Sequence, residues 1–173
     1  EIATDPAAPP VYGGLVHSHE KGMVEGLASS QGLFALRRIE IPEPLDDFFF
    51  DPPYRNLIGS SRDGKAVVVN LNVGRVIKQL EVPGLPHLGS GIAWSWNGRP
   101  VMATPHLKAG RISVLDLQDW SVVRVIETPG PVFFMRSHEN IPHAWVDAMM
   151  RPAKDTMQLL DKRTLEVVKT LRP

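Results

Sequence analysis

The chain has 173 residues, enough for one domain with a hydrophobic core. Its 19 Lys and Arg residues balance 19 Asp and Glu residues, so neither a nucleic-acid-binding surface nor a surface for anionic membranes is expected. It contains no Cys, which excludes disulfides, thiolate nucleophiles, Cys-ligated metals and a C-x-x-C-H attachment site for c-type heme within this sequence.

The sequence carries neither of the patterns that direct a chain into or across a membrane. It lacks a run of about eighteen apolar residues, and its first ten residues lack the basic start and apolar stretch of a signal peptide. Because the chain starts at Glu1 rather than Met, we expect a processed or excised piece of a longer protein.

The first predicted strand covers residues 14–20 and carries two histidines, His17 and His19. Residues two apart on a strand point to the same face, so both imidazoles share one face. Such a pair is suited to binding a metal or moving protons, and the plainer alternative is two exposed or backbone-bonded histidines. Residues 22–28 and 33–39 predict two further, paired strands.

Two aspartates, Asp46 and Asp47, stand between a Pro-rich segment at 41–44 and three phenylalanines at 48–50. A carboxylate held beside such an apolar run is suited to act as a general base. The alternative is a surface turn that exposes both carboxylates.

Three later segments repeat one pattern: an apolar strand, a polar turn and a second apolar strand. The Asn or Asp that ends the first strand is Asn70, Asp116 or Asp161, so successive copies are 46 and 45 residues apart. This period is typical of β-propeller blades. The repeated Asn or Asp needs no functional explanation, because short polar side chains bind turn amides.

Further short strands precede these hairpins and complete each repeat. They are predicted at 57–60, 91–96, 101–104, 131–136 and 144–148. With four strands per repeat, the sequence predicts an all-β fold of roughly four antiparallel propeller blades. We expect one partial propeller domain over residues 1–173, with blade-like units at 12–50, 51–95, 96–140 and 141–173.

The strand at 91–96 carries Trp94 and Trp96, and a Gly-rich turn with His87 leads into it. The two tryptophans share one strand face, where we expect them to fill a layer between blades. Turns near the axis of a propeller often hold ligands, although a turn histidine can equally be solvated. The sequence contains no hydrolase elbow, phosphate loop or metalloprotease motif.

Four motifs carry a resemblance to a known family: LVHSHE at 15–20, LDDFFFD at 45–51 with Arg55 behind it, PHLGSG at 86–91 and ATPHLKAG at 103–110. In their order and spacing they resemble the heme d1-binding domain of the cytochrome cd1 nitrite reductase family, over nearly the whole chain. The resemblance implies a periplasmic eight-bladed propeller that holds heme d1 in its central channel and receives or gives electrons through a c-type cytochrome. This chain resembles the C-terminal half of that propeller.

The resemblance also implies roles for individual residues. His19 matches one of two histidines that serve nitrite reduction, whereas Asp46 stands where the second is expected. Ser90 stands where an arginine that pairs a heme carboxylate is expected. His87 matches a histidine near the macrocycle, and we expect His17, His87 and Ser90 to contact the cofactor. The departures at Asp46 and Ser90 argue against nitrite reduction.

Residues 27–34 and 44–50 are more similar to the branch of the family that oxidises dihydro-heme d1 to heme d1, the last step of heme d1 biogenesis in denitrification. That reaction desaturates a propionate side chain and needs a base, for which His19, Asp46 and His87 are candidates. The alternatives are a cytochrome cd1 nitrite reductase and a non-catalytic scaffold that carries heme d1 or binds a protein.

Two expectations concern assembly and the site. We expect the chain to form a homodimer, because about four blades leave strand edges and apolar blade faces uncovered. We also expect His19 and His87 to face a common cavity at the propeller axis, since both lie on or beside first strands of blade-like units.

Overall fold

The computed structural model describes residues 2–3, 14–18, 23–28, 35–148 and 153–172 of the chain, with side chains from residue 38 onward. The chain has two compact units, Glu1–Glu81 and Val82–Pro173. Within the described ranges, no helix is long and apolar enough to span a membrane.

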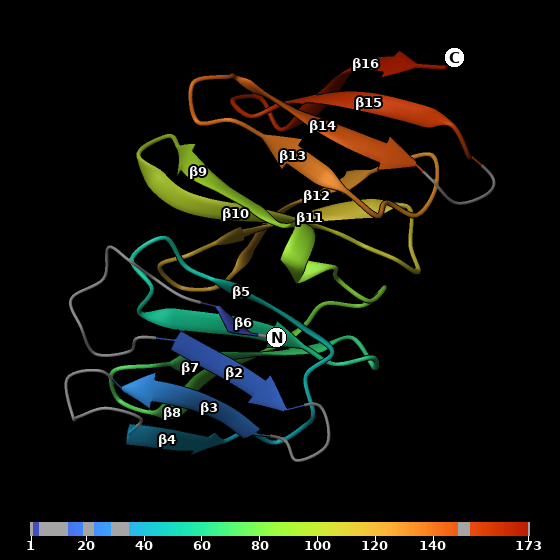
Figure 1. Cartoon of the computed structure of the whole chain (residues 1–173). Helices are drawn as coiled ribbons and strands as arrows, with labels where there is room; N and C mark the ends of the chain where they lie inside the picture. The colour runs from blue at the N-terminus through green and yellow to red at the C-terminus, as the bar shows by residue number, and fades with distance from the viewer. Residues whose placement is uncertain (1, 4–13, 19–22, 29–34, 149–152, 173) are drawn as a thin grey trace. The chain divides into compact units, whose positions relative to one another are not determined.

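Unit 1 contains two four-stranded antiparallel sheets in which strands that are consecutive in sequence are also neighbours in the sheet (Figure 1). The first sheet consists of β1 (Ile2–Ala3), β2 (Gly14–Ser18), β3 (Met23–Ala28) and β4 (Ala35–Glu40). The second consists of β5 (Asp47–Phe50), β6 (Asn56–Ser60), β7 (Lys65–Asn70) and β8 (Arg75–Glu81). Ile39 of the first sheet joins Leu57 and Val69 of the second in one buried cluster.

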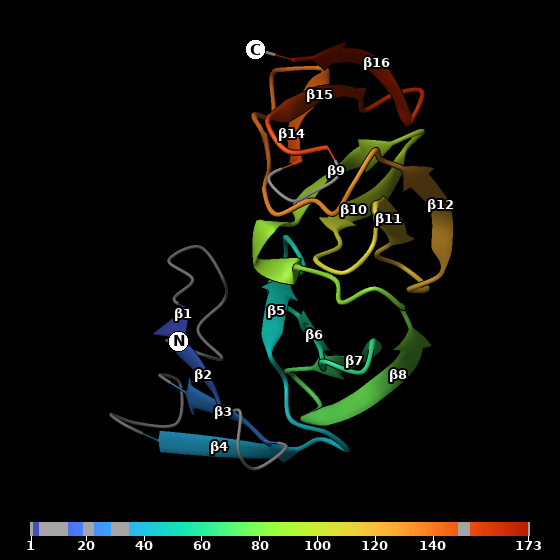
Figure 2. The ribbon, with the colours of Figure 1, turned by 90° about the vertical axis from the view of Figure 1, so that its right-hand side faces the viewer.

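Unit 2 repeats this arrangement with two more four-stranded sheets. The first consists of β9 (Ile92–Trp96), β10 (Arg99–Pro105), β11 (Arg111–Asp116) and β12 (Val122–Glu127), preceded by a short 3-10 turn, η2 (Leu88–Ser90). The second consists of β13 (Met135–Ser137), β14 (His143–Ala148), β15 (Thr156–Asp161) and β16 (Glu166–Leu171). Figure 2 shows strands β9 to β12 following one another across their sheet.

Burial differs sharply between the strands of one sheet. In β10 every residue from Val101 onward is buried, and in β11 every residue except Arg111 is buried. The reason is that both faces of these middle strands are covered. The fourth strands, β8, β12 and β16, are largely exposed. The core of unit 2 joins Val101 and Val114 of one sheet to Val146 and Leu160 of the other.

In the last three sheets, the predicted Asn or Asp at the end of the third strand binds the turn that follows it, as expected. Asn70 Oδ1 accepts the N–H of Val73 (2.9 Å), and Asp116 Oδ1 accepts that of Gln118 (2.7 Å). Asp161 Oδ1 accepts the N–H of Arg163 at 2.7 Å. The structural explanation of these three residues is therefore confirmed.

Trp94 and Trp96 of β9 lie between the two sheets of unit 2. Both pack against its core, and their indole N–H groups donate to the backbone carbonyls of Lys162 (3.0 Å) and Arg163 (2.8 Å), in the turn between β15 and β16. The prediction that they fill a layer between blades is confirmed.

The all-β fold of four-stranded antiparallel sheets was predicted correctly, whereas the sheets are offset from the expected unit bounds. They span 2–40, 47–81, 92–127 and 135–171 rather than 12–50, 51–95, 96–140 and 141–173. The expected units placed β5, β9 and β13 at the end of the preceding sheet, because the spacing of hairpins gives the length of a repeat but not its first strand. That all residues form one propeller domain stays a prediction.

Candidate functional site

The turn that carries His87 is held by backbone hydrogen bonds to the end of β10 and to the segment that follows it. The N–H of His87 donates to the carbonyl of Pro105 (2.8 Å), and that of Lys108 donates to the carbonyl of Gly84 (2.9 Å). Gly84 has φ +106, and a Cβ at this position would lie 2.8 Å from the Cβ of Ala109. Only glycine fits there, so the turn has a fixed backbone path before η2.

The imidazole of His87 is half-buried and bonded to the backbone of a distant segment. Its Nδ1 lies 2.7 Å from the carbonyl oxygen of Phe133, and its ring meets the Phe133 ring edge-on, with 4.8 Å between centroids. A carbonyl oxygen can only accept, so Nδ1 carries the hydrogen of this bond. In the neutral ring, Nε2 is therefore the nitrogen with the lone pair.

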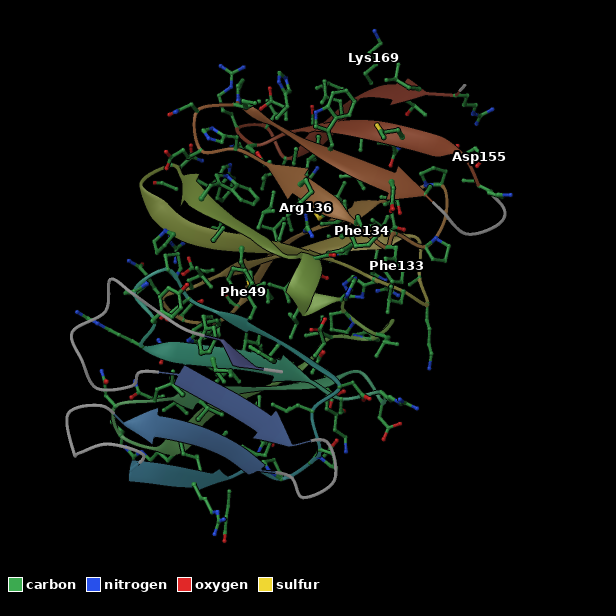
Figure 3. The ribbon with its side chains drawn as sticks, viewed as in Figure 1. Phe49, Phe133, Phe134, Arg136, Asp155 and Lys169 are labelled. Atoms are coloured by element: carbon green, nitrogen blue, oxygen red, sulfur yellow. The ribbon has the colours of Figure 1, made fainter. Side chains whose placement is uncertain are left out.

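Two phenylalanines and an arginine extend this contact into a small cluster, labelled in Figure 3. The rings of Phe133 and Phe134 meet edge-on at 4.7 Å, and the Arg136 guanidinium lies 5.7 Å from the Phe134 ring centre. Phe134 is 43% exposed. The cluster thus offers an apolar edge and a cation next to a histidine, a combination suited to a flat, anionic ligand.

Asp147 of β14 organises the backbone of this cluster. Its Oδ1 accepts the N–H groups of both Phe133 and Phe134, each at 2.9 Å. The predicted strand at 131–136 consequently begins only at Met135, because the two preceding amides bind a side chain instead of the β13–β14 ladder. Nothing in the sequence pattern singled out Asp147, since the bond joins residues fourteen positions apart.

Ser90 lies on the same turn as His87, and its N–H donates to the His87 carbonyl (3.1 Å). It is 1% exposed, so it belongs to the inside of the turn. Its predicted contact with a cofactor stays a prediction.

His106 is completely buried beneath the His87 turn, where Pro86 pairs with it in an antiparallel bridge. Its Nε2 lies 2.9 Å from the Ser113 hydroxyl. Burial, aided by the charge of Arg111, lowers the pKa of His106 from 6.5 to about 4. Sequence reasoning noted this residue only as part of the motif at 103–110.

Asp46 lies in unit 1, where its carboxylate forms an ion pair with Arg62. The Arg62 Nε donates to Asp46 Oδ1 at 2.8 Å, and the Asp46 side chain is 28% exposed. Of the adjacent phenylalanines, Phe48 is buried in the core, and Phe50 packs partly buried against it. These two rings therefore point inward beside a partly exposed, paired carboxylate, and the catalytic role of Asp46 stays a prediction.

The remaining predicted site residues are only partly within the described structure. His17 lies on β2, opposite Val24 of β3, and its side chain is not among those that the structure describes. His19 lies outside the described residues, and with it the predicted cavity shared with His87. Among described residues, no group of three or more His, Cys, Asp or Glu forms a candidate metal site.

The repeated sheets and the motif residues around His87 define the class to which the chain belongs, the cytochrome D1 heme domain family, whose model matches residues 26–173. This confirms the family resemblance inferred from the motifs.

Among curated proteins, the chain is 46% identical to the dihydro-heme d1 dehydrogenase of Pseudomonas aeruginosa over 140 residues, which cover 80% of this chain and 28% of that protein. It is 32% identical to protein NirF of the same organism over 100 residues, 58% of this chain and 24% of that protein.

Among solved structures, the chain resembles the dihydro-heme d1 dehydrogenase NirN in complex with DHE, with a TM-score of 0.88 and 42% identity. The match covers 96% of this chain and 36% of that one. The matched part of the chain therefore spans about a quarter to a third of the length of these relatives.

Proposed function

We propose that the chain is part of a dihydro-heme d1 dehydrogenase and that its His87 cluster contacts the tetrapyrrole substrate. The observation that carries the proposal is the placement of His87 beside Phe133, Phe134 and Arg136 in a member of this family. The similarity to the NirN structure in complex with DHE supports the substrate class.

The residues present fit such a ligand. A tetrapyrrole is flat, largely apolar and carries carboxylates at its edge. Phe133 and Phe134 supply aromatic surface, and the exposed Arg136 supplies a cation able to pair with a carboxylate. His87 supplies a ring nitrogen that can accept a proton, because its other nitrogen is bonded to a carbonyl.

The reaction class requires a base and an electron acceptor. Desaturating a propionate side chain releases two protons and two electrons, and the bound tetrapyrrole supplies the conjugated ring through which the electrons leave. We propose a c-type cytochrome as the acceptor. His87 is our first candidate for the base, and Asp46 and His19 remain the others; the ion pair with Arg62 already engages Asp46.

Measurements on the full-length protein test this proposal. Absorbance titration with heme d1 measures binding, and turnover of dihydro-heme d1 measures activity. We expect His87→Ala to reduce turnover by about 100-fold while binding is largely kept. Asp46→Asn tests the second candidate, and His138→Ala, an exposed histidine, is the control. Full activity of His87→Ala would transfer the role to Asp46 or His19.

Two alternatives give different outcomes in the same assays. A cytochrome cd1 nitrite reductase would reduce nitrite; Asp46 and Ser90, which depart from the residues expected there, weigh against it. A non-catalytic heme d1 carrier would bind the tetrapyrrole without turnover.

We also propose a periplasmic location and homodimer formation by this chain. The outer face of the β13–β16 sheet exposes Trp145 and Met157, each 44% accessible, and such apolar surface favours association with a second copy. Light scattering at micromolar concentration measures the mass of the chain, and a monomer would contradict the dimer. Cell fractionation tests the location.

A further inference from the structure

We infer that Asp147 is a positioning residue for His87: its carboxylate holds the Phe133–Phe134 peptide in the orientation that fixes the proton of the imidazole on Nδ1. The inference concerns two residues of unit 2 that lie far apart in sequence, one on β14 and the other in the turn before η2. It rests on the proposed function, in which His87 Nε2 contacts or deprotonates the substrate.

The first step is the bond from Asp147 to the peptide. One carboxylate oxygen accepts two N–H groups, from Phe133 and Phe134, at 2.9 Å each. The backbone N–H of Asp147 in turn donates to the carbonyl of Phe134 at 3.2 Å. These three bonds hold the segment ahead of β13 against β14.

The second step follows from the geometry of a peptide bond. The carbonyl of Phe133 and the N–H of Phe134 belong to the same planar peptide, and in the trans form they point in opposite directions. When the Phe134 N–H points to Asp147, the Phe133 carbonyl must point away from it. It then meets His87 Nδ1 at 2.7 Å.

The third step concerns the imidazole. Because Nδ1–H donates to the Phe133 carbonyl, the neutral His87 ring has its lone pair on Nε2, and the edge-on contact with the Phe133 ring limits rotation. Without the bond to Asp147 the peptide can rotate, and the carbonyl no longer selects this tautomer. A ring with the proton on Nε2 cannot accept another there, so Asp147 controls whether His87 can act as a base.

The test compares the unmodified chain with the variants Asp147→Asn and Asp147→Ala, all without tetrapyrrole. Long-range proton–nitrogen NMR spectra of histidine-labelled protein distinguish the Nδ1–H from the Nε2–H tautomer of His87. We expect Nδ1–H in the unmodified chain and in Asp147→Asn, which keeps an oxygen acceptor. We expect loss of that preference in Asp147→Ala. Glu166→Ala, which removes an exposed carboxylate from β16, is the matched control.

Activity of the full-length protein supplies the second measurement. We expect Asp147→Ala to lower kcat for dihydro-heme d1 oxidation by about 10-fold to 100-fold, and Asp147→Asn to restore most of it. If Asp147→Ala does not fold, Asp147→Ser, whose shorter side chain cannot reach both amides, carries the same expectations.

Two outcomes overturn the inference: an Nε2–H tautomer in the unmodified chain, or an unchanged Nδ1–H tautomer in Asp147→Ala or Asp147→Ser. A chain that shows the expected tautomers but whose full-length form does not bind or oxidise the tetrapyrrole instead overturns the proposed function. The two failures are thus separated, because the NMR measurement needs no ligand.

Discussion

Gly59 of β6 lies so close to Leu45 that a Cβ on the glycine would be 2.3 Å from Leu45 Cδ1. Leu45 is 2% exposed and packed in the core of unit 1, so its side chain has little room to move away. This glycine therefore serves close packing in the middle of a strand, not a turn.

We expect Gly59→Ala to lower the free energy of unfolding by about 1–3 kcal/mol, because the added methyl group overpacks the core. Urea denaturation measures the change. The double variant Gly59→Ala/Leu45→Val should lose less than the sum of the two single variants, since valine makes room for the methyl group. Strict additivity would contradict the steric explanation.

Removing the indole N–H of Trp94 should weaken the contact between the two sheets of unit 2. We expect Trp94→Phe to cost about 1 kcal/mol from the lost hydrogen bond to the Lys162 carbonyl, with a further loss from reduced packing. Trp145→Phe, on the exposed outer face of β14, serves as the control and should change stability by less. Equal losses in urea denaturation would contradict a role for the Trp94 bond.

The buried His106 should make the chain sensitive to mild acid. Its pKa is lowered to about 4 in the folded chain from 6.5, so between these values the unfolded chain binds a proton that the folded chain does not. Stability should therefore fall as the pH drops from about 6.5 to about 4, by an amount of about 3 kcal/mol for this group alone.

Urea midpoints measured across this pH range test the role of His106. His106→Gln should flatten the profile, whereas His138→Gln, at an exposed position, should leave it nearly unchanged. A profile that stays equally steep in His106→Gln would assign the acid sensitivity to other groups.

We expect the turn after β15 to depend more on a hydrogen-bond acceptor at Asp161 than on the charge of its carboxylate. The pKa of Asp161 is lowered, mainly because its carboxylate accepts a hydrogen bond from the backbone N–H of Arg163, and burial opposes this effect. We expect Asp161→Ala to cost about 1 kcal/mol and Asp161→Asn clearly less, because Asn70 fills the same role after β7.

The pH dependence provides the contrast between these two variants and the unmodified chain. With a lowered folded-state pKa, the contribution of the Asp161 charge is present above about pH 3.8 and is lost below it. Asp161→Asn should remove this loss in strong acid. If Asp161→Asn instead destabilises the chain as much as Asp161→Ala at neutral pH, the charge itself is essential.

The strands could be predicted because their signals are local. Apolar runs and the turn residues Asn70, Asp116 and Asp161 each act over a few neighbouring positions, and the 45-residue spacing repeats these local signals along the chain. Apart from the later start of β13, the structure places strands where they indicate. The His87 turn was recognisable for the same reason, through its glycines and family motif.

The contacts of the candidate site depend on residues far apart in sequence, and for this reason they were not foreseen. Phe133 meets His87 across 46 positions, and Trp94 reaches Lys162 across 68. The pattern around Asp46 indicated a carboxylate beside apolar residues, but its ion pair with Arg62 depends on how the chain folds. The periodicity of a strand sequence indicates which face of the strand is apolar, but it does not indicate which polar atoms come into contact.

The exposed fourth strands have a consequence for local opening of the sheets. Since β8, β12 and β16 bury few side chains, detaching one of them exposes little apolar surface and breaks one ladder of backbone hydrogen bonds. Amide protons on these strands will therefore exchange with solvent through small fluctuations, while those between β10 and β11 or β14 and β15 exchange only when a whole unit unfolds. Each of these three sheets will fray from that edge inward, and the paired middle strands behind it will be the last part of the sheet to be lost.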